Sequence, residues 1–210
     1  MIFLKTITTL SLLSSALFSN SIKEIDTNYA KSMQGISYHE GCPVALTDLR
    51  IVNIKYLGFD EAIHYGDMIV HKDVALEVSK IFEELFDINY AIEQITPIEK
   101  YKADDFESIE ANNTSAFNCR KAEGSNKYSK HSYGKAIDIN PIQNPYIYKD
   151  GTSSHKKSKE FIARVFKEDT IENKAMLLAN SKAVAIFKKY GWKWGGDWKT
   201  IKDYQHFQKQ

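Results

Sequence analysis

Residues 129–140 read SKHSYGKAIDIN, and this stretch does most to decide the fold. Its second half alternates apolar and polar residues, so two isoleucines point to one face of a strand and Asp138 points to the other. Gly134 permits a turn just before that strand. We therefore expect His131 to lie in a loop and Asp138 to lie on the strand that follows it.

Outward from this stretch, patterns of strands and helices follow one another in mixed order. Residues 49–56 alternate as a strand, and a second alternating run at 63–70 follows after turn residues, which predicts a hairpin. Apolar residues at helical spacing follow Asp73, which can cap that helix. The other predicted elements are a short strand at 92–96, helices at 159–167 and 182–190, and two aromatic strands in the last twenty residues. Mixed order of this kind predicts an α+β fold with an antiparallel sheet.

The composition is that of a globular chain with one core. The 210 residues include 28 Lys and Arg against 27 Asp and Glu, a formal charge of +1, so we expect no nucleic-acid partner. With 43% hydrophobic and 12% aromatic residues, the chain is too apolar to be disordered. Its sequence holds no apolar run as long as a membrane-spanning helix needs, so we expect no stable membrane insertion.

The first twenty residues have the pattern of a secretory signal peptide. One lysine precedes an apolar run at 7–18, and small residues follow it. The alternative is an uncleaved membrane anchor, which is disfavoured because the run is short and contains five hydroxyl residues. We divide the chain into a signal peptide (1–20), an N-terminal tail (21–40) and a main domain (41–210), and expect a secreted or periplasmic protein.

The chain has two cysteines, Cys42 and Cys119. An oxidising compartment favours a disulfide between them, and in the chain-entropy model such a bridge contributes about 4–5 kcal/mol before strain is subtracted. A competing hypothesis makes Cys119 a catalytic thiol with a histidine partner. It is disfavoured, because an extracellular thiol beside a second cysteine usually oxidises.

Side chains suited to metal chemistry fall in three clusters: SKHSYGKAIDIN, GWKWGGDW (191–198) and DYQHF (203–207). His131, Asp138 and His206 offer two imidazoles and one carboxylate, the ligand number of a catalytic zinc site that keeps a fourth position for water. Asp203 precedes His206 by three residues. If His206 lies on a strand, Asp203 should lie just before it, in a bend that turns its carboxylate toward the metal.

These clusters, together with NTSAFNCR at 113–120, resemble the zinc D-alanyl-D-alanine carboxypeptidase family, which also includes L-alanyl-D-glutamate endopeptidases. The similarity extends over roughly residues 41–207. It implies the fold shared with the hedgehog signalling domain, a small antiparallel sheet flanked by helices, and makes 41–210 a single catalytic domain.

The resemblance also implies a role for each site residue. The pattern S-x-H-x-x-G-x-A-x-D makes His131 and Asp138 ligands of one zinc ion, and the closing D-x-x-H makes His206 the third ligand and Asp203 the general base. Arg120 is implied as a second stabiliser of the oxyanion or as an anchor for a substrate carboxylate. A structural ion pair is the alternative for this arginine.

The implied function is hydrolysis of peptidoglycan stem peptides, by a D-alanyl-D-alanine carboxypeptidase or an LD-endopeptidase, so a peptidoglycan peptide is the expected partner. The alternative is a non-catalytic zinc-containing module that binds the cell wall or a protein on the same fold. It is disfavoured, because a binding module does not need a base at Asp203. Trp192, Trp194 and Trp198 are expected to be core or wall residues.

Overall fold

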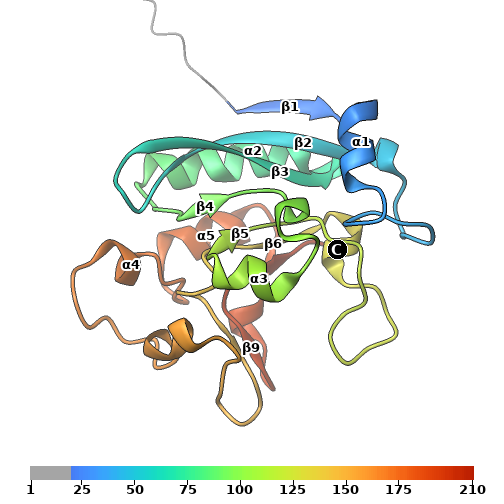
Figure 1. Cartoon of the computed structure of the whole chain (residues 1–210). Coiled ribbons are helices and arrows are strands. Elements are labelled where there is room, and N and C mark those ends of the chain that lie inside the picture. Colours follow the sequence, from blue (N-terminus) through green and yellow to red (C-terminus); the bar gives the residue numbers. More distant parts are fainter. Residues whose placement is uncertain (1–19) are drawn as a thin grey trace, which may run out of the picture.

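The computed structural model describes residues 20–210, in which short strands and helices are mixed along the chain (Figure 1). The predicted signal peptide lies outside the described residues except for Asn20. The strands are β1 (Ser21–Glu24), β2 (Leu49–Leu57), β3 (Ile63–His71), β4 (Gln94–Ile95), β5 (Asn113–Thr114), β6 (Ala136–Asp138), β7 (Tyr146–Ile147), β8 (Lys193–Trp194), β9 (Lys202–Asp203) and β10 (His206–Gln208). The α-helices are α1 (Thr27–Met33), α2 (Lys72–Asp87), α3 (Asp105–Glu110), α4 (Ile171–Lys174) and α5 (Lys182–Lys189), and the 3₁₀ helices include η3 (Lys130–Tyr133) and η4 (Lys156–Phe161). The predicted α+β fold is confirmed.

One antiparallel sheet, in the order β1-β2-β3, lies at the top of Figure 1. β2 and β3 pair along their whole length, which confirms the predicted hairpin. β1 pairs with the other edge of β2, so the segment expected to be an N-terminal tail is part of this sheet. Alternate side chains of β2 enter two apolar clusters. Val52 and Ile54 pack with α2, whereas Leu49 and Ile51 pack with Met33 of α1.

The helix predicted after Asp73 is α2, and its apolar side chains are buried against the hairpin. Its cap differs from the prediction. His71 is the N-cap residue, and its ring Nδ1 accepts a hydrogen bond from the Asp73 N–H at 3.2 Å. Asp73 therefore lies in the first turn, where its negative charge still stabilises the helix dipole.

A second antiparallel sheet, in the order β6-β10-β8, carries the C-terminal strands. Ile137 on β6 is the Cα partner of Phe207 on β10, and both side chains are completely buried. The Phe207 ring stacks on Phe187 of α5 with 3.9 Å between ring centroids. Because successive residues of a strand point to opposite faces, Asp138 and His206 point away from this core.

The helix predicted at 159–167 is wrong. η4 ends at Phe161, and Arg164 has a left-handed backbone with φ +52°. The guanidinium of Arg164 donates to the Leu177 carbonyl at 2.8 Å and to Asn144 Oδ1 at 2.9 Å. These contacts hold the segment in a conformation that cannot continue a right-handed helix. The last twenty residues also differ from the prediction, since they form three strands rather than two.

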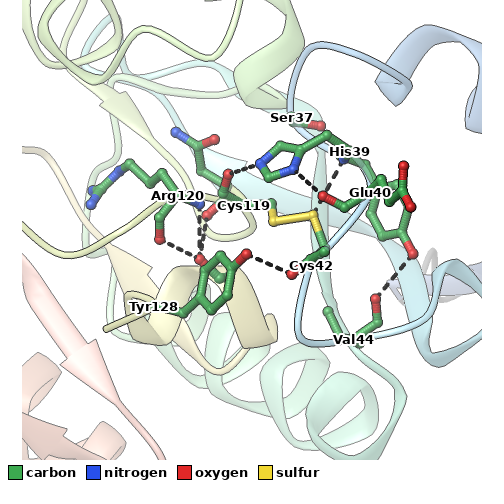
Figure 2. Close-up of a disulfide and its surroundings, with 12 residues drawn as sticks. Ser37, His39, Glu40, Cys42, Val44, Cys119, Arg120 and Tyr128 are labelled. Carbon is green, nitrogen blue, oxygen red and sulfur yellow. Dashed lines mark hydrogen bonds between the residues drawn. A yellow bond between two sulfur atoms is a disulfide. The ribbon is translucent and has the colours of Figure 1, made fainter. Parts of the chain in front are cut away.

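A disulfide joins Cys42 to Cys119, as predicted, with 5.9 Å between the Cα atoms (Figure 2). It connects the loop that follows α1 to the segment that leads into Arg120. The hypothesis of a catalytic Cys119 is therefore wrong, because its sulfur is not a thiol. Within residues 20–210, none of the helices has the length and hydropathy that a membrane span requires.

Gly134 generates a stability prediction. It ends η3 with φ +62°, and a Cβ added there would lie 2.5 Å from the backbone nitrogen of His71. We expect Gly134→Ala to lower the free energy of unfolding by about 3 kcal/mol or more, because a left-handed alanine is strained and its methyl group must push β3 away. Gly191→Ala is the matched control. Gly191 has φ +80° but no atom within 4 Å of its added Cβ, so the expected loss is about 1 kcal/mol. Chemical denaturation measures both, and equal losses would contradict the close approach at Gly134.

Candidate metal centre

Two strands from distant parts of the chain place Asp138 and His206 side by side. The two residues are Cα partners in the antiparallel pair of β6 and β10, so their side chains point to the same face. Asp138 Oδ1 lies 2.9 Å from His206 Nδ1. The placement of Asp138 on a strand, predicted from the alternating pattern, is confirmed.

His131 reaches the same point from η3, the turn before β6. Ser129 caps this turn, since its Oγ accepts a hydrogen bond from the His131 N–H at 3.3 Å, and Gly134 ends it. His131 Nε2 lies 3.2 Å from Asp138 Oδ2 and 3.2 Å from His206 Nδ1. The structure thus brings together the three residues predicted as ligands, with their ligand atoms within 4.8 Å of one another.

Hydrogen bonds on the far side of each imidazole determine where its proton lies. His131 Nδ1 donates to the carbonyl of Ala116, and His206 Nε2 donates to Gln208 Oε1 at 3.2 Å. With those protons in place, His131 Nε2 and His206 Nδ1 turn lone pairs toward each other and toward the Asp138 carboxylate. Three such groups repel one another unless a cation lies between them. The arrangement therefore fits a divalent metal ion, and zinc suits two nitrogens and one oxygen.

Without a metal ion, a proton replaces the missing positive charge. Burial lowers the pKa of His206, but its hydrogen bond to Asp138 and the charge of that carboxylate outweigh burial and raise the pKa to about 9. Burial raises the pKa of Asp138, but the charges and hydrogen bonds of His131 and His206 outweigh it, and the net pKa is lowered. The metal-free site thus keeps a proton between His206 and Asp138.

Asp203 lies on β9 and not in the predicted bend; the bend follows it and leads to His206 on β10. It is the Cα partner of Tyr146 on β7, and Gly195 makes room for it, because a Cβ at Gly195 would lie 2.4 Å from the Asp203 carbonyl oxygen. The carboxyl group is buried, and its Oδ1 has no hydrogen-bond partner within residues 20–210. Burial raises the pKa of Asp203 to about 7, against the opposing charge of His206. Asp203 thus lines the cavity of the candidate metal site with one buried carboxyl oxygen that no group in the described residues satisfies, which is unusual for a structural carboxylate.

Arg120 lines the cavity that contains the three candidate ligands. Its guanidinium forms an ion pair with Asp105 on α3. Its backbone N–H donates to Ser132 Oγ at 2.9 Å, and that hydroxyl donates back to the Arg120 carbonyl at 2.6 Å. Arg120 is therefore anchored to the turn that carries His131. The structural ion pair considered from the sequence is present, and a role toward substrate stays a prediction.

All five predicted site residues line one cavity of about 620 Å³. Trp198 forms part of its wall, with its ring centroid 5.6 Å from that of His206. Trp192 and Trp194 are buried in the core. The expectation that the tryptophans serve as core or wall is confirmed.

Several other residues of the cavity could not be predicted from the sequence. Tyr146 and Tyr148 line it, and so does His155, whose Nδ1 lies 2.7 Å from Glu110 Oε1 and whose ring stacks on Phe106. No local pattern marks these residues. Tyr146 reaches the cavity only because β7 pairs with β9, a strand more than fifty residues away in the chain.

A second group of residues is also close enough to hold a metal ion, namely His39, Cys42 and Cys119. The two sulfur atoms are bonded to each other (Figure 2), so they are not thiolate ligands. In the described part of the chain, His131, Asp138 and His206 are the group in which no ligand atom is covalently bonded to another ligand atom.

Comparison with known proteins supports the resemblance seen in the sequence. A family model described as D-alanyl-D-alanine carboxypeptidase matches residues 123–209. This segment contains the three candidate ligands and Asp203, whereas Arg120 lies just before it. The match confirms the resemblance over this segment and supports a peptidase of the carboxypeptidase type. No solved structure is a significant match to the chain.

We expect the metal-free protein to lose stability as the pH rises from about 4 to 9. The folded-state pKa of Asp203, about 7, lies above its ordinary value of 3.8, and that of His206, about 9, lies above 6.5. Between each pair of values the folded protein keeps a proton that the unfolded chain has released, so the free energy of unfolding falls as pH rises. Thermal melts in the presence of a chelator measure this trend.

The variant Asp203→Asn separates the contribution of Asp203 to the pH dependence of stability from that of His206, because a neutral amide replaces the protonated acid. Its gain in stability over the wild type should grow between pH 4 and 7 and then stay constant. The same pH dependence in the variant and the wild type would contradict a protonated, buried Asp203. Zinc should stabilise the protein more as pH rises, since the ion binds the deprotonated ligands.

Proposed function

We propose that the chain is an exported zinc metallopeptidase that hydrolyses the stem peptides of peptidoglycan, as a D-alanyl-D-alanine carboxypeptidase or an LD-endopeptidase. One observation carries the proposal: the buried carboxylate of Asp203, with an unpartnered oxygen, lines the same cavity as three converging ligand atoms. The family match supports the peptidase activity. The disulfide and the predicted signal peptide support a secreted or periplasmic location.

His131, Asp138 and His206 would hold one zinc ion, and three protein ligands leave a position open for water or substrate. When bound, the ion supplies a Lewis acid that polarises the scissile carbonyl and makes water a nucleophile near neutral pH. The Ala116 carbonyl and the Gln208 side chain keep the two imidazole rings oriented for this task, through the hydrogen bonds to their outer nitrogens.

Asp203 would act first as a general base and then as a general acid. Its side chain lines the cavity with the three candidate ligands, so its carboxylate would accept a proton from the attacking water and pass it to the leaving amine. Burial raises the pKa of this carboxyl group, which favours its protonated form after it has taken the proton from water. The products are a carboxylic acid and an amine.

Arg120 would bind an oxygen of the substrate, either the developing oxyanion or a carboxylate. A guanidinium has five N–H donors, so the ion pair with Asp105 leaves donors for a ligand. The same ion pair, with the backbone hydrogen bonds to Ser132, would hold the side chain in place before substrate binds.

The substitution Asp203→Asn tests the role of the carboxylate. The variant should still bind one zinc ion per chain, because the three ligands are unchanged, while hydrolysis of purified muropeptides falls by about 10²- to 10⁴-fold. Products identified by mass spectrometry and zinc measured by elemental analysis give the two readouts. Asp169→Asn, at an exposed aspartate that pairs with Lys174, is the matched control and should hydrolyse at the wild-type rate.

Two further digestions with the wild-type protein test the metal and the cysteines. A chelator should abolish hydrolysis by the wild type, and a thiol reagent should leave it unchanged, because Cys119 is in a disulfide. Full activity of Asp203→Asn would overturn the role of the base. A wild-type protein that binds zinc but leaves every muropeptide intact would instead support a non-catalytic binding module.

A further inference from the structure

Two tyrosines, Tyr146 and Tyr148, line the cavity of the candidate metal site together with Asp203. Tyr146 is the Cα partner of Asp203 across β7 and β9, so both side chains lie on the same face of this strand pair. The rings of Tyr146 and Tyr148 pack edge to face, with centroids 5.0 Å apart and planes at 71°. Both rings line the cavity that contains the candidate metal ligands.

A carboxylate completes this wall. Glu123, in the loop after Lys121, also lines the cavity, and its Oε1 accepts a hydrogen bond from the Tyr148 hydroxyl at 3.4 Å. Within the described residues, the Glu123 carboxylate has the Tyr148 hydroxyl as its side-chain hydrogen-bond partner. No lysine or arginine of those residues forms an ion pair with Glu123. The carboxylate is exposed to solvent, so a ligand can reach it.

Three lysine and arginine side chains line the cavity, and one of them, Lys130, is exposed with its Nζ 5.7 Å from the centroid of the Tyr133 ring. The other two have closer partners. Arg120 is paired with Asp105, and Lys121 Nζ lies 3.5 Å from the centroid of the Tyr128 ring. The charged side chains that act on Tyr146 are the carboxylates of Glu123 and Asp203. Burial raises the pKa of the Tyr146 phenol, and the charge of Glu123 raises it further. This part of the cavity therefore attracts positive charge.

We propose that Glu123, Tyr146 and Tyr148 form a subsite for a primary ammonium group on a side chain of the peptide substrate. Aromatic rings attract ammonium groups, and a carboxylate adds a charged hydrogen-bond acceptor. That the ligand is a peptide rests on the proposed function. The subsite would select peptides that carry an aminoalkyl side chain near the scissile bond. Binding at the subsite itself needs no hydrolysis.

The test compares two peptides bound by the zinc-loaded Asp203→Asn protein, in which binding is separated from cleavage. One is the N-acetylated pentapeptide L-Ala-γ-D-Glu-L-Lys-D-Ala-D-Ala, and the other has an acetyl group on the lysine side chain. We expect isothermal titration calorimetry at low salt to show about 5- to 20-fold tighter binding of the first peptide. The difference should shrink at high salt, because the subsite is partly exposed.

Substitutions in the same protein assign the effect to the subsite. Glu123→Gln removes the charge and Tyr146→Leu removes the aromatic ring, so each should reduce the ratio of the two affinities to below about 2-fold. Glu160→Gln is the matched control, since this exposed glutamate does not line the cavity, and it should keep the full ratio.

Equal affinity for the two peptides, a full ratio in both cavity variants, or no measurable binding of either peptide would overturn the subsite. The outcome is separable from that of the proposed function. If the ratio is present but the zinc-loaded wild type cleaves neither peptide, hydrolysis is wrong and the subsite stands. If both peptides are cleaved at equal rates and bound equally, the subsite alone is wrong.

Discussion

The register of β6 against β10 is the constraint on which the candidate site depends. It places His206 opposite Asp138, and a slip of β10 by one residue would turn His206 toward the core while Asp138 stayed on the polar face. The neighbouring pair, Ile137 and Phe207, prevents such a slip because both side chains are completely buried and Phe207 stacks on Phe187. The hydrophobic core thus determines the geometry of the polar site, and no metal ion is needed to align two of the three candidate ligands.

The third candidate ligand depends on a wall assembled from several segments. His131 is oriented by the Ala116 carbonyl, and its turn is joined to Arg120 through Ser132. Behind Arg120, the disulfide and a hydrogen bond from Cys119 N–H to the Ser37 carbonyl hold the preceding residue (Figure 2). The N-terminal part of the chain, which the family model does not match, therefore supports one wall of the cavity.

Several features could be predicted because they depend on local pattern or on residue type. Alternation placed the β2–β3 hairpin and the strand of Asp138, and helical spacing placed α2 and α5. The two cysteines allowed a single intramolecular pairing. The candidate ligands could be named because histidine and aspartate side chains suit zinc, and because the spacing around them resembles one family. Their convergence required the structure, since His131 and His206 are far apart in the chain.

The sequence by itself determined the α+β class, the hairpin, the disulfide and the choice of candidate ligands. The tertiary structure alone decided that Arg164 would interrupt a helical pattern, that Asp105 would pair with Arg120, and that Tyr146 would face the cavity beside Asp203. The reason is physical. Local pattern reflects the conformational preference of a few neighbouring residues, whereas these outcomes depend on contacts between segments whose distance in space is set only when the whole core packs.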